Sequence, residues 1–191
     1  MANILYDALF GKHANRDTPF LWLEDGTKVT HASFLNLTAQ FAYVLTDAGL
    51  SVGDRVAVQI EKSGASLAIY AACVQAGFVF LPLNTAYTTD EVQYFVQNSG
   101  AKFLVCDPAK ADALRNVVDQ AGAQLETLDV SGIGSLAAIA EAKDTTFVTV
   151  DRSGDDLAAF LYTSGTTGRS KGAMLSHQNL LSNSKVLANL W

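Results

Sequence analysis

The sequence predicts an α/β fold in which a mainly parallel sheet is flanked by helices and preceded by an N-terminal β-hairpin. One observation behind this prediction is the repeated alternation of apolar, strand-like runs with helical stretches between residues 55 and 128. A second is that glycine or proline separates most of these stretches. The chain has 191 residues, of which 49% are hydrophobic, and it can therefore bury a substantial core.

The first 50 residues predict two helices with a hairpin between them. Residues Ile4 to Phe10 have the pattern of a short amphipathic helix. Two strand-like runs, 20–23 and 27–30, meet at Asp25-Gly26, which is typical of a two-residue hairpin turn. A longer helix is expected from Ala32 to Ala48, with one apolar face and a glycine after its last residue.

The middle of the chain repeats strand and helix, which favours parallel strands joined by right-handed crossovers. We expect strands at 55–60, 78–81, 102–106 and 124–128, and helices at 65–76, 89–98 and 109–121, the second helix capped by Thr89-Asp90. The uncharged stretch from Ser63 to Thr89 imitates a membrane span. Gly77 and Pro82 divide it, however, so we expect a buried helix and a buried strand.

Periodicity fades between residues 131 and 156, where small residues become common and only a short helix, Leu136 to Ala140, is expected. This region is the best candidate for an internal subdomain boundary. Beyond it, Leu157 to Leu161 is apolar enough for a strand that is buried on both faces. A second strand is expected at 172–175, followed by a helix from His177 for which no stop signal occurs before Trp191.

The stretch Tyr162 to Gly172, between the last two strands, is polar and punctuated by glycine. Glycines let backbone N–H groups converge on an anion, and hydroxyl groups with one ammonium group can neutralise its charge. The side chains that could do so are Thr163, Ser164, Thr166, Thr167 and Lys171. Such a composition is also typical of a flexible linker. The strands on both sides favour an anion site, at the sheet edge where ligands of α/β proteins bind.

The same stretch is not a Walker A loop. Counted from Gly165, that pattern requires glycine where this chain has Ser170 and a hydroxyl where it has Gly172. A dinucleotide-binding GxGxxG sequence is absent as well.

Composition excludes several other functions. The net charge is −6, which gives no basic footprint for nucleic acid or for an anionic membrane surface. The start of the chain lacks a charged-then-apolar leader, and Cys73 and Cys106 have apolar neighbours, so we expect a cytoplasmic protein with free, inert thiols. The cysteines and the scattered histidines lack metal-ligand spacing.

The residues Thr163 to His177, TSGTTGRSKGAMLSH, resemble the phosphate-binding signature of the adenylate-forming superfamily, which includes acyl-CoA synthetases, peptide-synthetase adenylation domains and luciferases. Most members have proline where this chain has Ser170, a change that bears on the stiffness of the loop. Further stretches resemble the malonyl-CoA synthetase branch of the superfamily. These stretches are 61–63, 81–88, 105–108 and Arg169-Ser170-Lys171.

The resemblance implies an ATP-dependent ligase that activates a small carboxylate, malonate, through an acyl-adenylate and then transfers the acyl group to coenzyme A. It implies that Thr163, Ser164, Gly165, Thr166, Thr167 and Gly168 hold the ATP phosphates, with Mg²⁺ near Thr166 and Thr167. Lys171 would be catalytic because it steadies the departing pyrophosphate. A ligase for another short or medium carboxylic acid is one alternative, and a non-catalytic fragment or phosphate-binding module is another.

Such synthetases are much longer than 191 residues, so the resemblance covers only their N-terminal, AMP-binding part. The acyl pocket, the hinge and the C-terminal domain have no counterpart in this chain. We therefore expect the isolated chain to be inactive. We also expect it to cover its exposed sheet edges and apolar faces by oligomerising or by binding a missing C-terminal part.

Overall fold

The computed structural model describes residues 3–163 and 170–190. At the N-terminus, α1 (Ile4–Leu9) and the 3-10 helix η1 (Gly11–His13) lead into an antiparallel hairpin of β1 (Pro19–Trp22) and β2 (Lys28–Thr30). The hairpin connection spans residues 23–27, so the expected two-residue turn is wrong. The Leu23 N–H donates to the Thr27 carbonyl, and the Thr27 N–H donates to the Asp25 carboxylate at 2.8 Å. These two hydrogen bonds stabilise the longer loop.

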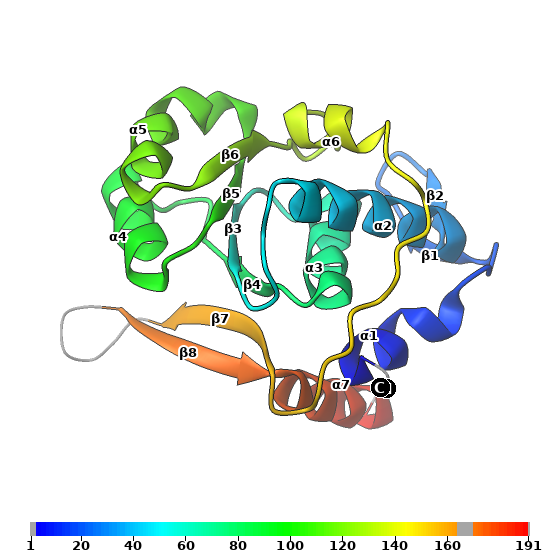
Figure 1. Ribbon diagram of the computed structural model, residues 1–191. Coiled ribbons are helices and arrows are strands. Elements are labelled where there is room, and N and C mark those ends of the chain that lie inside the picture. The colour runs from blue at the N-terminus through cyan, green and yellow to red at the C-terminus, as the bar shows by residue number, and fades with distance from the viewer. Residues whose placement is uncertain (1–2, 164–169, 191) are drawn as a thin grey trace.

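The main sheet has six strands in the order β6-β5-β3-β4-β7-β8 (Figure 1). All neighbouring strands are parallel except β7 and β8. The strands are β3 (Arg55–Gln59), β4 (Val79–Pro82), β5 (Phe103–Cys106), β6 (Gln124–Thr127), β7 (Leu157–Thr163) and β8 (Lys171–Ser176). The expected α/β fold with a mainly parallel sheet and an N-terminal hairpin is therefore confirmed.

Helices cover both faces of this sheet and create two separate cores. On one face, α2 (His31–Asp47) and α3 (Gly64–Ala76) pack over Val56 and Val58. On the other face, α4 (Thr89–Ser99) and α5 (Ala111–Ala121) pack over Ala57 (Figure 1). Successive residues of a strand point to opposite faces, so a strand covered on both sides is apolar throughout. This double coverage explains the uninterrupted apolar runs of the central strands.

The other helices in the described part of the chain occur after residue 107. The 3-10 helix η2 (Pro108–Lys110) precedes α5, α6 (Ser135–Ala140) packs against α2, and α7 (His177–Leu190) packs against α1. Local sequence sets several helix starts: the α4 helix begins with a capping box in which the Thr88 hydroxyl and the Glu91 carboxylate bond each other's backbone N–H. Thr88 is therefore the cap, rather than the expected Thr89-Asp90.

Strand β7 differs from the sequence-based expectation in its burial. Of its residues only Ala158 and Ala159 are buried, because its neighbour β8 lies at the sheet edge. Large apolar side chains are exposed on β8, where Met174 is 62% exposed, and on α7, where Leu190 is 73% exposed. Among the described residues no helix is both long enough and apolar enough to cross a membrane.

Candidate functional site

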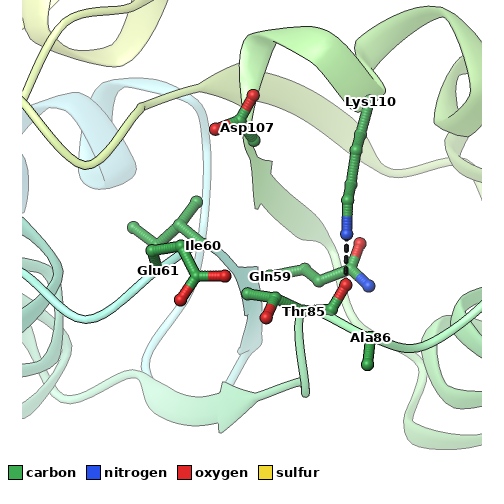
Figure 2. A pocket seen from close by; sticks show the side chains of 7 residues that line it. All are labelled: Gln59, Ile60, Glu61, Thr85, Ala86, Asp107 and Lys110. Carbon is green, nitrogen blue, oxygen red and sulfur yellow. Dashed lines mark hydrogen bonds between the residues drawn. The ribbon is translucent and has the colours of Figure 1, made fainter.

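The carboxyl ends of β3, β4, β5 and β7 share one edge of the sheet, because these strands are parallel. From β3 the chain continues to β4 on one side, whereas from β5 it continues to β6 on the other. The order of strands therefore reverses between β3 and β5, and open α/β sheets bind ligands in the crevice at such a point. A hollow of about 250 Å³ lies there (Figure 2).

The hollow is built from the residues that follow three parallel strands. Its lining residues are Gln59, Ile60, Glu61, Thr85, Ala86, Asp107 and Lys110. Figure 2 shows that Asp107 and Lys110 come from the segment after β5, and that Thr85 and Ala86 come from the segment after β4.

Gln59 is the structural centre of this hollow. Its side chain is only 1% exposed, and its Nε2 donates to the carbonyls of Asn84 and Tyr87 at 3.0 and 3.1 Å. Lys110 Nζ donates to the carbonyl of Thr85 from the opposite side (Figure 2). The segment after β4 is thus held from two directions. Gln59 Oε1 has no hydrogen-bond partner among the described residues.

The charges around the hollow limit what it can bind. Glu61 and Asp107 contribute carboxylates, although Asp107 Oδ1 already accepts from the Ala109 N–H, and the Lys110 ammonium uses one of its three donors on the Thr85 carbonyl. Two carboxylates face one ammonium, so a ligand with N–H groups fits better than a phosphate. Within the described ranges no group of three histidine, cysteine or acidic side chains could hold a metal ion.

The second part of the candidate site is the end of the β7–β8 hairpin. Tyr162 pairs with Gly172 and Thr163 pairs with Lys171, and the Thr163 hydroxyl donates to the Lys171 carbonyl at 3.4 Å. Of the site residues expected from the sequence, the structure therefore brings Thr163 and Lys171 together. The other expected residues, Ser164, Gly165, Thr166, Thr167 and Gly168, lie outside the described residues.

Helix α4 packs against this hairpin through aromatic side chains. The rings of Phe95 and Tyr162 lie 4.4 Å apart, centroid to centroid, and the Tyr162 hydroxyl donates to Asn98 Oδ1 at 2.6 Å. The Tyr94 hydroxyl donates to the Ser170 carbonyl at 3.3 Å. Desolvation raises the pKa of Tyr162 to about 12, so its hydroxyl stays a neutral donor at physiological pH.

Sequence reasoning missed Gln59, Lys110, Tyr94 and Asn98. Gln59 offered a local signal, because it is a polar residue at the end of an otherwise apolar buried strand. The thiols behave as expected: both cysteines are buried, desolvation raises the pKa of Cys73, and it raises that of Cys106 to about 11.

Comparison with known proteins identifies the family of this chain. The profile of the AMP-binding enzyme family matches residues 11–190. The chain belongs to this family.

The relatives of this chain are considerably longer proteins. Its structure matches crystal structures of the malonyl-CoA synthetase MatB from Rhodopseudomonas palustris, apo and with ATP bound, at a TM-score of 0.95 and 47% and 48% identity. The match covers 100% of this chain and 38% of MatB. A feruloyl-CoA synthase of Amycolatopsis is 37% identical over 155 residues, which are 81% of this chain and 30% of that enzyme. This chain thus spans about a third of the length of these relatives.

The curated relatives carry different names. The long-chain-fatty-acid–CoA ligase FadD13 of Mycobacterium tuberculosis is 30% identical over 80% of this chain and 30% of its own length. The names of these relatives point to different acids, ferulate for one and long-chain fatty acids for another.

Proposed function

We propose that this chain supplies the phosphate-binding part of an ATP-dependent acyl-CoA ligase that acts on malonate. The observation that carries the proposal is the match of the whole chain to MatB at 47% identity and a TM-score of 0.95. The relatives whose names point to ferulate or long-chain fatty acids are 37% and 30% identical and cover less of the chain. A ligase for another short or medium acid is the alternative.

The reaction has two steps. A malonate carboxylate oxygen bonds to the α-phosphorus of ATP while the bond from that phosphorus to pyrophosphate breaks. The sulfur of coenzyme A then bonds to the acyl carbon, its proton is lost, and AMP leaves. The protein's part in the first step is positioning and charge stabilisation.

In this proposal the residues from Thr163 to Gly168 hold the β- and γ-phosphates, and Lys171 neutralises the charge that develops on pyrophosphate. Thr163 and Lys171 meet where β7 ends and β8 begins, on the edge that ligands of parallel sheets use. The Lys171 residue is exposed, so its ammonium is accessible to a ligand.

Magnesium fits the hydroxyl oxygens of this stretch, because Mg²⁺ prefers oxygen ligands and commonly binds together with nucleotide phosphates. Thr166 and Thr167 are its proposed neighbours. When bound, the ion would neutralise phosphate charge. Since the described residues include no cluster of acidic, histidine or cysteine ligands, we expect the ion to arrive with ATP.

We assign the hollow beside Gln59 to part of coenzyme A, the second substrate. It lies on the same sheet edge as the end of β7. Its excess of acceptors suits the amide or amino N–H groups of coenzyme A and disfavours the phosphates.

A chimera tests the proposal. This chain replaces the matching 38% of R. palustris MatB, and malonate-dependent pyrophosphate release is measured with ATP and coenzyme A. We expect turnover by the chimera and none by the isolated 191-residue chain, for which calorimetry should show weak or absent ATP binding. A folded chimera that releases no pyrophosphate would contradict the proposal. The intact gene product, assayed with malonate, ferulate and a long-chain fatty acid, then decides the acid.

A further inference from the structure

We propose that Tyr94 and Asn98 of helix α4 are positioning residues for the nucleotide, because they fix the two strands that carry the phosphate-binding stretch. The inference rests on the proposed function of that stretch. Neither side chain is expected to touch ATP. Tyr94 acts through the backbone of Ser170, and Asn98 acts through the hydroxyl of Tyr162.

The hairpin needs support from outside the sheet. Strand β7 pairs with β4 at a single position, Phe80 with Ala159, and β4 ends at Pro82. Strand β8 is at the sheet edge. The hairpin therefore extends past the end of β4, beneath α4, as Figure 1 shows. From Phe160 onward β7 is paired with β8 alone.

Helix α4 supplies this support on both strands. The Tyr162 hydroxyl, one residue before Thr163, donates to Asn98 Oδ1 at 2.6 Å. The Ser170 carbonyl, one residue before Lys171, accepts from the Tyr94 hydroxyl at 3.3 Å. The two hydrogen bonds thus hold Tyr162 and Ser170, the residues that directly precede Thr163 and Lys171. Tyr94 and Asn98 lie four positions apart, on the same face of the helix.

Ring packing and the hydroxyl bonds make separable contributions. The ring of Phe95 packs against the tilted ring of Tyr162, and that contact holds the hairpin against the helix without any hydroxyl group. The two hydroxyl hydrogen bonds also fix the orientation of the strands, because a hydrogen bond weakens steeply when its angle departs from linearity. When the strand pair is already held in one orientation, ligand binding loses less free energy to ordering it. Removing a hydroxyl should therefore weaken nucleotide binding while leaving the packed core intact.

The test uses the MatB chimera and three single variants, Tyr94→Phe, Asn98→Ala and Tyr162→Phe. Each should raise the KM for ATP by about two- to tenfold, the range expected for one hydrogen bond. The KM for malonate should stay unchanged, and the melting temperature should fall by no more than about 2–4 °C, the shift expected from about 1 kcal/mol. Tyr43→Phe, on α2, and Gln97→Ala, on α4, are matched controls with no side-chain hydrogen bond among the described residues, and they should leave the KM for ATP unchanged.

A double-mutant cycle separates positioning from a general structural effect. Asn98→Ala combined with Tyr162→Phe should raise the KM for ATP no more than the stronger single variant, because both changes remove the same hydrogen bond. An active chimera in which the three variants keep the ATP KM of the unmodified protein would overturn the inference alone. A lowered melting temperature without a selective rise in that KM would also overturn it. A folded chimera without turnover would overturn the proposed function, and the inference with it.

Discussion

Phe160 packs directly against the backbone of Gly172 across the β7–β8 pair. A Cβ atom placed on Gly172 would lie 2.3 Å from two atoms of the Phe160 ring. Such a distance is far below van der Waals contact, so any side chain at this position must displace the ring. The Phe160 ring also meets Tyr162 edge to face at 5.3 Å, and its displacement would therefore reach the residues that precede Thr163.

The variant Gly172→Ala should lower the free energy of unfolding by about 1–3 kcal/mol, the usual cost of overpacking. Urea unfolding of the chain measures this. Gly154→Ala is the matched control, because its Cβ would come no closer than 3.3 Å to a neighbour. Equal stability of the Gly172→Ala protein and the wild type would show that the ring moves aside without cost.

Lys171→Ala should reduce malonate-dependent pyrophosphate release by about 10²-fold or more, the size seen when a donor that stabilises developing charge is removed. Stability should not change, since the Lys171 residue is exposed. Lys102→Ala removes an exposed lysine elsewhere and is the control. Normal pyrophosphate release by the Lys171→Ala chimera would refute the role given to this ammonium group.

Gln59→Met should destabilise the chain by about 1–3 kcal/mol, because it removes two hydrogen bonds, to the carbonyls of Asn84 and Tyr87, each of which contributes about 0.5–1.5 kcal/mol. In the chimera it should also raise the KM for coenzyme A more than the KM for ATP, since the hollow loses its support. Gln97→Met, at an exposed position, is the control. If the two KM values rise equally, the hollow is not the coenzyme A site.

The central strands could be predicted because a strand that is buried on both faces has a continuous apolar sequence, as at Val56–Val58 and Phe103–Cys106. The partial burial of Leu157–Leu161 could not be predicted, because an apolar run does not show that the neighbouring strand lies at the sheet edge. Likewise, the hollow beside Gln59 forms because β5 lies next to β3. The hydrophobic periodicity of a single segment does not indicate this pairing. Tyr94 and Asn98 contact residues 76 and 64 positions away, so only the folded chain shows their partners.

Self-association should occur through α7, whose side chains Val186, Leu187 and Leu190 are 56%, 49% and 73% exposed. Positions 186, 187 and 190 lie on one helix face, and clustered exposed apolar groups favour contact with another apolar surface. Sedimentation velocity should show association that grows with concentration. Leu187→Lys should weaken it strongly, while Ala188→Lys, at an exposed position on another side of the helix, adds the same charge and should not. A monomer at all concentrations would contradict this prediction.

Stability should depend on pH through His177, which is fully buried and has no hydrogen-bond partner on either ring nitrogen among the described residues. Desolvation, with a contribution from the Arg152 charge, lowers the pKa of His177 from 6.5 to about 4, although Asp156 opposes the shift. The folded state therefore binds this proton more weakly than the unfolded state does. The stabilisation is fully present above pH 6.5 and is lost as the pH falls toward 4, by up to about 3 kcal/mol in all.

Urea unfolding between pH 7 and pH 4.5 measures this loss. The window lies above the range in which Asp25, Glu91 and Asp156 lose their charge, because hydrogen bonds lower the pKa of each of these carboxyl groups. His177→Leu should flatten the dependence on pH whatever its effect on stability at pH 7, since it removes the group that binds the proton. His13→Gln is the comparison variant: desolvation and the neighbouring charges of His31, Arg16 and Lys12 also lower the pKa of His13, so this variant should lose only the part of the slope that His13 causes and keep the part due to His177. The same slope in His177→Leu and in the wild type would assign the pH dependence to other groups.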